Sequence, residues 1–108
     1  MERGILYVAS HPASPEREAE FNTWYEKVHI PEVCALPGFV GVRRYAPVKP
    51  GDPYVSLYDI EGEDLNEVVG GLFKTAAKGG FAMSDSMRMD PRPEMRTLRF
   101  TSSYTPEG

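Results

Sequence analysis

The stretch FVGVRRYAPVKPGDPYVSLYDIE, residues 39–61, predicts two strands joined by a short turn. Its two arms, residues 39–48 and 54–61, are rich in the valine and tyrosine side chains that strands favour, and the segment KPGDP between them has the composition of a turn. We therefore expect a β-hairpin at the centre of the chain. Gly41 lies inside the first arm, where a glycine often marks a bulge or the close approach of another segment.

A helical pattern precedes this hairpin. Apolar positions recur at helical spacing from Phe21 to His29 and predict one buried stripe, while the Ser-Pro pair at residues 14–15 suits the N-cap and the first helical position. Pro31 disfavours helical geometry at Ile30, so we expect the helix to break there and a short second turn to follow. The predicted break lies directly beside His29.

A second helical pattern follows the hairpin. Apolar residues repeat at helical spacing from Leu65 to Ala76. Asp64 is placed to cap the start of this helix, and Gly79 with Gly80 is placed to end it. Together with the first pattern, this predicts one helix before the hairpin in the sequence and one helix after it.

Two more strand patterns lie near the ends of the chain, at residues 5–10 and 95–104, and the segment 81–94 before the last one predicts a long loop. The order is therefore β-α-β-β-α-β. This is the order of the ferredoxin-like α+β unit, in which a four-stranded antiparallel sheet carries both helices on one face. Residues 1–108 are enough for a single domain with one hydrophobic core.

The predicted strands carry apolar or aromatic residues on both faces. In the segment 54–61, for example, Tyr54 and Tyr58 alternate with Val55 and Leu57. Two helices cover one face of the sheet, and the rest of the chain is too short to cover the other. A second copy would bury it, so we predict a homodimer that packs sheet against sheet.

Composition and charge argue against several classes of protein. Apolar residues make up 41% and charged residues 26% of the chain, and no apolar run is long enough to cross a bilayer. A formal net charge of −4 provides no basic face for nucleic acid. The first apolar run is too short for a signal peptide, and the single Cys34 suits a reducing compartment. We expect a cytoplasmic protein with no membrane or nucleic-acid partner.

The run EFNTWYEKVHIPEVCALPGFVGVRRY, residues 20–45, followed by PYVSLYDIE at 53–61 and MSDSM at 83–87, resembles the dimeric α/β-barrel superfamily and specifically its small EthD-like proteins. The most specific features are the aromatic pair, the His-x-Pro step, the Leu-Pro-Gly-Phe segment and the Arg-Arg-Tyr segment at residues 43–45. The resemblance implies a ferredoxin-like domain that dimerises into an α/β barrel, with a pocket between helices and sheet that the helix-end histidine, His29, faces. It does not imply one reaction, because the superfamily includes isomerases, cyclases, lyases and monooxygenases.

Three residues are candidates for catalysis. The imidazole of His29 titrates near neutral pH and can both accept and donate a proton, and Tyr25 lies one turn earlier on the same helix face as a hydrogen-bond donor. The alternative for His29 is a core histidine that bonds a backbone carbonyl freed near Pro31. His11 shares a strand face with Tyr7 and can approach His29 if that face points toward the helices; otherwise it is an exposed turn residue.

Candidate substrate-binding residues are mostly aromatic, which favours an aromatic or otherwise apolar ligand. Of the adjacent Arg43 and Arg44 only one can face a pocket, where its guanidinium would hold a carboxylate or enolate; the alternative is a surface ion pair. Methionines in the segment 83–89 would form either a pliable lid or part of a disordered loop. The full set of candidates is Tyr7, Phe21, Trp24, Arg44, Tyr45, Tyr58 and Phe73.

These features predict a cofactor-independent enzyme that moves a proton next to a carbonyl on a small aromatic or hydrophobic metabolite, as a lyase, isomerase or cyclase. His29 would be the general acid/base. Three alternatives remain open: a cofactor-free monooxygenase of the same fold, a non-enzymatic dimer that binds a small molecule, and a structural accessory protein whose space between helices and sheet is packed solid. We expect no metal site, because Glu26 and His29 match only half of a di-iron motif and the ligand-spaced partners are missing.

Overall fold

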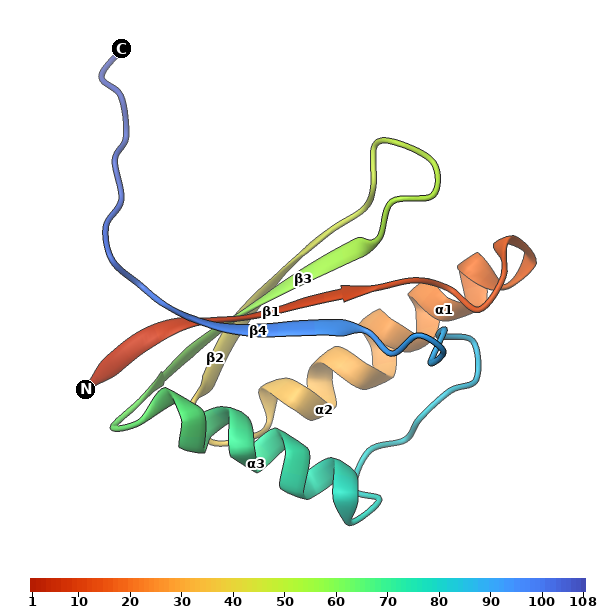
Figure 1. Ribbon diagram of the computed structural model, residues 1–108, viewed down its shortest axis with the longest axis horizontal. Helices are drawn as coiled ribbons and strands as arrows, with labels where there is room; N and C mark the ends of the chain where they lie inside the picture. The colour runs from red at the N-terminus through yellow and green to blue at the C-terminus, as the bar shows by residue number, and fades with distance from the viewer.

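The computed structural model describes residues 1–108, and its four strands form one antiparallel sheet with all helices on one face (Figure 1). The strand order is β2-β3-β1-β4. The central strands are β1 (Glu2–Ser10) and β3 (Tyr54–Gly62), and the edge strands are β2 (Phe39–Tyr45) and β4 (Glu94–Arg99). The predicted α+β fold with a four-stranded antiparallel sheet is confirmed.

The predicted first helix is a continuous helical arm made of four short pieces. They are a 3₁₀ turn, η1 (Pro15–Arg17), then α1 (Glu18–Trp24), a π-helical turn, η2 (Tyr25–His29), and α2 (Ile30–Cys34). Pro15 occupies the expected first helical position. Ser14 lies at the N-cap but forms no side-chain capping bond. We call residues 15–34 the first helical arm.

The break predicted at Ile30 was wrong. Ile30 keeps helical dihedral angles, φ −58° and ψ −48°, and its N–H donates to the carbonyl of Tyr25, five residues earlier. This wider π-type turn replaces the normal four-residue bonding just before Pro31, which has no N–H to donate and whose ring crowds the preceding turn. The helix is therefore widened at His29 and continues past it.

The second helix, α3 (Leu65–Ala77), matches its prediction. The side chain of Asp64 accepts a hydrogen bond from the backbone N–H of Asn66 at 2.9 Å, which makes it the N-cap. Gly79 has φ +70°, and the N–H of Gly80 donates to the carbonyl of Thr75 at 2.9 Å. These are the features of a glycine-terminated helix end, so both predicted ends of the helix are confirmed.

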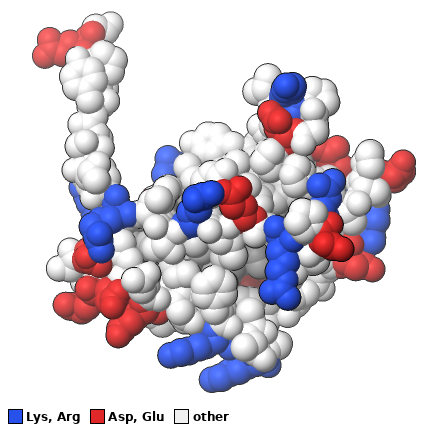
Figure 2. Space-filling model, in the orientation of Figure 1, with Lys and Arg blue, Asp and Glu red and all other residues white.

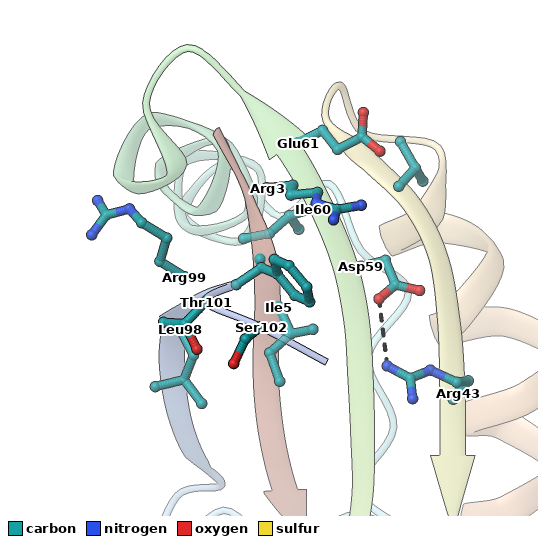
Figure 3. Close-up of a pocket in the computed structure, with 13 residues that line it drawn as sticks. Arg3, Ile5, Arg43, Asp59, Ile60, Glu61, Leu98, Arg99, Thr101 and Ser102 are labelled. Carbon is teal, nitrogen blue, oxygen red and sulfur yellow. Dashed lines mark hydrogen bonds and ion pairs between the residues drawn. The ribbon is translucent and has the colours of Figure 1, made fainter. Parts of the chain in front are cut away.

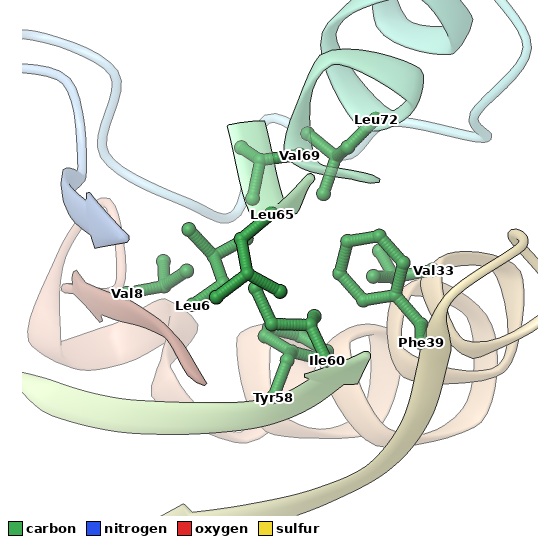
Figure 4. Close-up of a cluster of buried hydrophobic side chains, with 9 residues drawn as sticks. All are labelled: Leu6, Val8, Val33, Phe39, Tyr58, Ile60, Leu65, Val69 and Leu72. Carbon is green, nitrogen blue, oxygen red and sulfur yellow. The ribbon is translucent and has the colours of Figure 1, made fainter. Parts of the chain in front are cut away.

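The main hydrophobic core lies between the sheet, the second half of the helical arm and α3 (Figure 4). Its alternate strand residues point toward the helices, which is the pattern of a sheet with one covered face. Nine buried residues form it: Leu6, Val8, Val33, Phe39, Tyr58, Ile60, Leu65, Val69 and Leu72. A second cluster lies against the earlier part of the helical arm and contains Phe21, Trp24, Tyr25, Tyr54 and Met87.

The edge strands are shorter than predicted. β4 ends at Arg99, paired with Gly4, and not at residue 104; one further bond runs from the N–H of Phe100 to the carbonyl of Arg3, at 3.0 Å. Beyond it the chain extends away from the sheet on the side opposite the helices (Figure 1). β2 contains a register shift between Phe39 and Gly41, so the predicted bulge is confirmed.

Charged side chains of both signs are interspersed over the face of the molecule seen in Figure 2, with uncharged surface between them. No large area of that face carries a single sign. None of the helices combines the length and the apolar character needed to span a membrane.

Candidate functional site

A mainly apolar cavity of about 350 Å³ lies between the sheet, the helical arm, α3 and the loop that precedes β4. Twelve of its fifteen lining residues are hydrophobic, so it suits an apolar ligand. Only four of the lining residues have polar side-chain atoms: His29, Tyr25, Tyr58 and Arg92. We call this space the His29 cavity.

The imidazole of His29 is held by aromatic rings. It stacks on Trp24 with ring centroids 4.8 Å apart and an interplanar angle of 24°. Tyr25 and Phe81 meet it edge-on, at 5.0 and 5.9 Å between centroids. Because three rings from two segments surround the imidazole, its orientation is set by packing and not by a hydrogen bond.

This apolar surrounding changes the charge state of His29. Burial disfavours the imidazolium and lowers the pKa of His29 from 6.5 to about 4, against a smaller opposite effect of the Glu32 carboxylate. His29 is therefore neutral at pH 7. Its Nδ1 atom is buried without a hydrogen-bond partner, so the backbone carbonyl considered as its alternative partner is not bonded to it.

Two tyrosine hydroxyls lie side by side at the cavity. The hydroxyl of Tyr58 donates to the hydroxyl of Tyr25 at 3.4 Å, and both side chains are almost completely buried. Burial, followed by the proximity of Tyr25, raises the pKa of Tyr58 far above its ordinary value. Tyr58 therefore remains protonated over the physiological pH range and keeps the hydroxyl hydrogen that it donates to Tyr25.

The loop from Phe81 to Met89, which we call the methionine loop, closes one side of the cavity. The indole N–H of Trp24 donates to the carbonyl of Ala82 at 2.7 Å, and the N–H of Ala82 donates to the Glu32 carboxylate at 3.0 Å. Both partners flank His29 on the helical arm. The loop is thereby anchored next to the imidazole that it covers.

Methionine side chains form much of this wall. Met83, Met87 and Met89 from the loop and Met95 from β4 all line the cavity. The far end of the loop is fixed by a backbone bridge between Pro12 and Met87. Met83, Met87 and Met89 thus lie over the cavity, and the action of the loop as a pliable lid stays a prediction.

Arg44 faces the helices but does not line the His29 cavity. Its guanidinium lies over the rings of Tyr25 and Tyr54, at 4.4 and 4.6 Å from their centroids, and over Phe21 at 5.3 Å. Nη1 donates to Glu26 at 3.0 Å, while Nε and Nη2 are buried without partners. Arg44 therefore contacts the cavity only indirectly, through the ring of Tyr25.

The neighbouring Arg43 lies on the open face of the sheet. Its guanidinium is 3.5 Å from the carboxylate of Asp59, at the edge of a shallow depression of about 570 Å³ (Figure 3). Apolar side chains of Ile5 and Leu98 lie in the same depression. No helix covers this face (Figure 1).

The predicted site residues divide into three groups. His29, Tyr25, Tyr58 and Phe73 line the cavity. Trp24, Phe21 and Arg44 lie behind it, in contact with His29 or Tyr25. Tyr7 and Tyr45, which lie opposite Leu57 and Val55 in the sheet register, alternate with the buried strand residues and belong to the open face.

His11 is not brought to His29. The face of β1 that carries Tyr7 points away from the helices, so the condition for the approach of His11 is not met. The side chain of His11 instead borders two other cavities, next to Arg88. A catalytic role for His11 stays a prediction that this geometry does not favour.

Sequence reasoning missed part of the cavity wall. The missed residues include Val8, Val33, Leu72, Phe81, Arg92, Pro93 and Met95. Strand alternation and helical spacing identify the first three as inward-facing, but they do not separate a cavity wall from a packed core. Phe81, Arg92 and Pro93 belong to a segment without periodicity, so no local signal indicated which cavity they would line.

No group of three or more histidine, cysteine, aspartate and glutamate side chains is close enough together to hold a metal ion. Comparison with known proteins identifies no relative, since no protein-family model, no curated protein and no solved structure matches the chain. The resemblance to EthD-like proteins therefore stays a prediction.

Proposed function

We propose that this protein is a cofactor-independent acid/base enzyme that transfers a proton next to a carbonyl group of a small aromatic or hydrophobic metabolite, as a lyase, isomerase or cyclase. The observation that carries the proposal is a neutral, ring-packed His29 that lines an apolar cavity together with the hydrogen-bonded pair Tyr25 and Tyr58. Perturbed titratable groups in a ligand-sized apolar cavity are typical of acid/base sites.

His29 has the lone pair that a general base requires, because its imidazole is neutral at pH 7. An imidazole with a pKa of about 4 is a weak base in the empty cavity. When it takes a proton from the carbon next to the carbonyl, an enolate forms beside it. The attraction between imidazolium and enolate is strong in an apolar cavity, so proton transfer becomes more favourable as the charges develop.

The tyrosine pair supplies the complementary donor. Tyr58 stays protonated, and its hydroxyl donates toward Tyr25, which leaves the hydroxyl hydrogen of Tyr25 free for the substrate oxygen. A chain of two hydroxyls stabilises a developing oxyanion more than one hydroxyl does, because each bond polarises the next. His29 would then move the proton, and Tyr25 would stabilise the oxygen.

Proton exchange tests this proposal without knowledge of the natural reaction. Phenylacetone is incubated with the protein in D₂O, and loss of the proton signal next to the carbonyl is followed by NMR. We expect the wild-type protein to accelerate the exchange and His29→Gln to reduce that acceleration by about 10²-fold or more. Lys27→Gln, an exposed change on the same turn, is the matched control and should retain it. Equal exchange with wild type and His29→Gln would contradict the proposal.

We further propose that the chain adopts a ferredoxin-like fold and dimerises into an α/β barrel, as the EthD-like resemblance implies. The strand order β2-β3-β1-β4 with helices on one face supports the fold. The uncovered face supports the dimer, because Val40, Leu98 and Phe100 expose 58%, 46% and 43% of their surface on it or at its margin. A second sheet packed there would bury them.

Light scattering tests the dimer. The wild-type protein should have twice the chain mass of 12.1 kDa at micromolar concentration. Leu98→Glu places a charge in the proposed interface and should shift the mass to that of one chain. Glu107→Gln, in the exposed tail, is the control and should leave the mass of the dimer unchanged. A single-chain mass for the wild type would contradict the dimer but not the acid/base chemistry.

One observation favours a second candidate function, a non-enzymatic dimer that binds a hydrophobic molecule. Catalytic histidines are usually oriented by a hydrogen bond to their second nitrogen, whereas Nδ1 of His29 has no partner. In a protein that only binds its ligand, His29 would be part of the cavity wall and would transfer no proton. This function predicts that phenylacetone quenches the fluorescence of Trp24 without any accelerated proton exchange, and that His29→Gln leaves binding intact.

A further inference from the structure

A second cavity adjoins the His29 cavity. It has a volume of about 320 Å³. Arg92 and Pro93 line this second cavity as well as the His29 cavity. Its remaining wall comes from the end of β1, where His11 lies, and from the loop, where Arg88 lies. We call this second space the arginine cavity. The two cavities therefore share one cationic lining residue, Arg92.

The two cavities differ in chemistry. Only one of the nine residues that line the arginine cavity is hydrophobic, whereas methionine and aromatic side chains dominate the His29 cavity. The charged and titratable residues that line the arginine cavity are Arg88, Arg92, His11 and Glu94. A molecule that reached from one cavity to the other would meet an apolar wall at one end and positive charge at the other.

The positive charge in the arginine cavity is not neutralised. The guanidinium groups of Arg88 and Arg92 form no ion pair and no hydrogen bond, unlike those of Arg17, Arg43, Arg44, Arg96 and Arg99. The one acidic residue in the wall, Glu94, is already paired with Arg96 at 2.6 Å. Two arginines at one cavity are thus available to a ligand.

Backbone contacts fix the position of Arg88 in the wall of the arginine cavity. The N–H of Arg88 donates to the carbonyl of His11 at 2.9 Å, and Pro12 pairs with Met87 in an isolated β-bridge. Arg88 and His11 therefore stay side by side. The same short ladder carries Met87 into the His29 cavity, so one piece of backbone connects the cationic wall to the apolar one.

We propose that the arginine cavity binds the oxyanion group of an amphipathic ligand whose apolar body occupies the His29 cavity. This inference rests on the proposed function of the His29 cavity and adds the class of ligand, a small aromatic or aliphatic acid. The planar guanidinium matches the two oxygens of a carboxylate or the oxygens of a phosphate. Arg92, at the junction, orients the molecule so that its uncharged part lies against His29 and the tyrosine pair.

Three matched ligands test the inference: 4-phenylbutyrate, 4-phenylbutan-1-ol and 4-phenylbutyl phosphate. Binding is followed by quenching of Trp24, the only tryptophan of the chain, which stacks on His29, and by calorimetry. We expect at least one anion to bind tenfold or more tightly than the alcohol. The tighter of the two anions identifies the oxyanion as a carboxylate or a phosphate.

Substitutions assign the effect to the arginine cavity. Arg92→Gln and Arg88→Gln should each reduce the affinity for the preferred anion about tenfold and leave the affinity for the alcohol unchanged. Arg99→Gln removes an exposed arginine on β4 that is paired with Glu2, and as the matched control it should change neither affinity. Far-UV circular dichroism confirms that each variant is folded.

The outcomes separate this inference from the proposed function. Equal affinity for the alcohol and both anions, or an equal loss of anion and alcohol binding in the arginine variants, overturns the arginine cavity while the His29 cavity stands. An absence of binding by all three ligands overturns both. Anion-selective binding together with no accelerated proton exchange keeps the arginine cavity and overturns the proposed acid/base chemistry.

Discussion

The two helical segments that cover the sheet are built differently. α3 is one regular α-helix with an aspartate cap at its start and a left-handed glycine after its end, and its buried residues are aliphatic. The first helical arm passes through 3₁₀, α, π and α geometry, and its buried residues are mainly aromatic. α3 has the caps and the regular bonding of a stable helix, apart from the two glycines in its interior, whereas the first helical arm departs from regular α-helical geometry at several points.

Buried polar atoms that lack a hydrogen-bond partner occur in or against the first helical arm and not in α3. The atoms are Oδ1 of Asn22, Nδ1 of His29, and Nε and Nη2 of Arg44. Asn22 and His29 belong to the first helical arm, and Arg44 packs against it through Glu26 and Tyr25. None belongs to α3. A buried polar group without a partner costs about 1–3 kcal/mol, so these groups lower the free energy of unfolding of the protein. Such local violations concentrate at functional sites.

The largest expected effect concerns α3. Leu65→Ala removes a side chain that is 3% exposed and should lower the free energy of unfolding by about 2–5 kcal/mol, because it leaves a cavity in the main core. Urea denaturation measures the change. Asn66→Ala, an exposed change at the next position, is the control and should have a much smaller effect. A loss below 1 kcal/mol for Leu65→Ala would mean that α3 contributes less to stability than its packing indicates.

The next effect concerns His29 and pH. Its pKa is lowered from 6.5 to about 4 in the folded state, so the unfolded chain takes up the proton first as the pH falls. The folded state should therefore lose about 3 kcal/mol relative to the unfolded state between pH 7 and pH 4, and no such loss occurs above pH 6.5.

Urea denaturation of wild type and His29→Gln at a series of pH values measures this loss. The variant has no imidazole at this position, so the difference in stability between the two proteins should change by about 3 kcal/mol over that range. His11→Gln removes the other histidine and is the comparison. A constant difference between wild type and His29→Gln would mean that the imidazole of His29 is solvated.

A smaller effect concerns Arg44. Arg44→Met keeps the length of the side chain and its contact with the three rings but removes two buried N–H groups without acceptors. We expect the free energy of unfolding to stay unchanged or to rise by up to about 2 kcal/mol. Arg44→Ala should instead lower it, because the space between the rings is left empty. A clear loss of stability in Arg44→Met would show that the attraction between the guanidinium and the rings contributes more free energy than the burial of its charge costs.

The smallest expected effect returns to α3. Gly70 lies inside the helix, and a Cβ added there meets nothing within 4 Å, so Gly70→Ala should raise the free energy of unfolding by about 0.5–1 kcal/mol. Gly38→Ala should have the opposite sign, since Gly38 has φ +87° and a Cβ would lie 2.7 Å from Val68. Thermal unfolding of both variants checks the pair. Destabilisation by Gly70→Ala would indicate a close contact at that face of α3.

The sequence by itself determined the order of the elements and the features of α3. Hydrophobic spacing, turn residues and the Asp64 and Gly79 signals act over a few residues, so local patterns were enough to predict them. The alternation of strand residues also placed Tyr58 and Leu57 on opposite faces. Local patterns did not predict the π turn at His29, because the effect of Pro31 depends on how the whole arm packs on the sheet.

Tertiary structure alone decided the candidate site. The charge state of His29 depends on burial by Trp24 and Phe81, and Phe81 reaches it because the methionine loop is anchored to the helical arm by bonds between residues 50 and 58 positions apart in the sequence. The face on which Tyr7 lies was likewise decided by which side of the sheet the helices cover. Periodicity in the sequence shows which residues share one face of a strand or helix, but only long-range packing determines whether that face contacts another element or solvent.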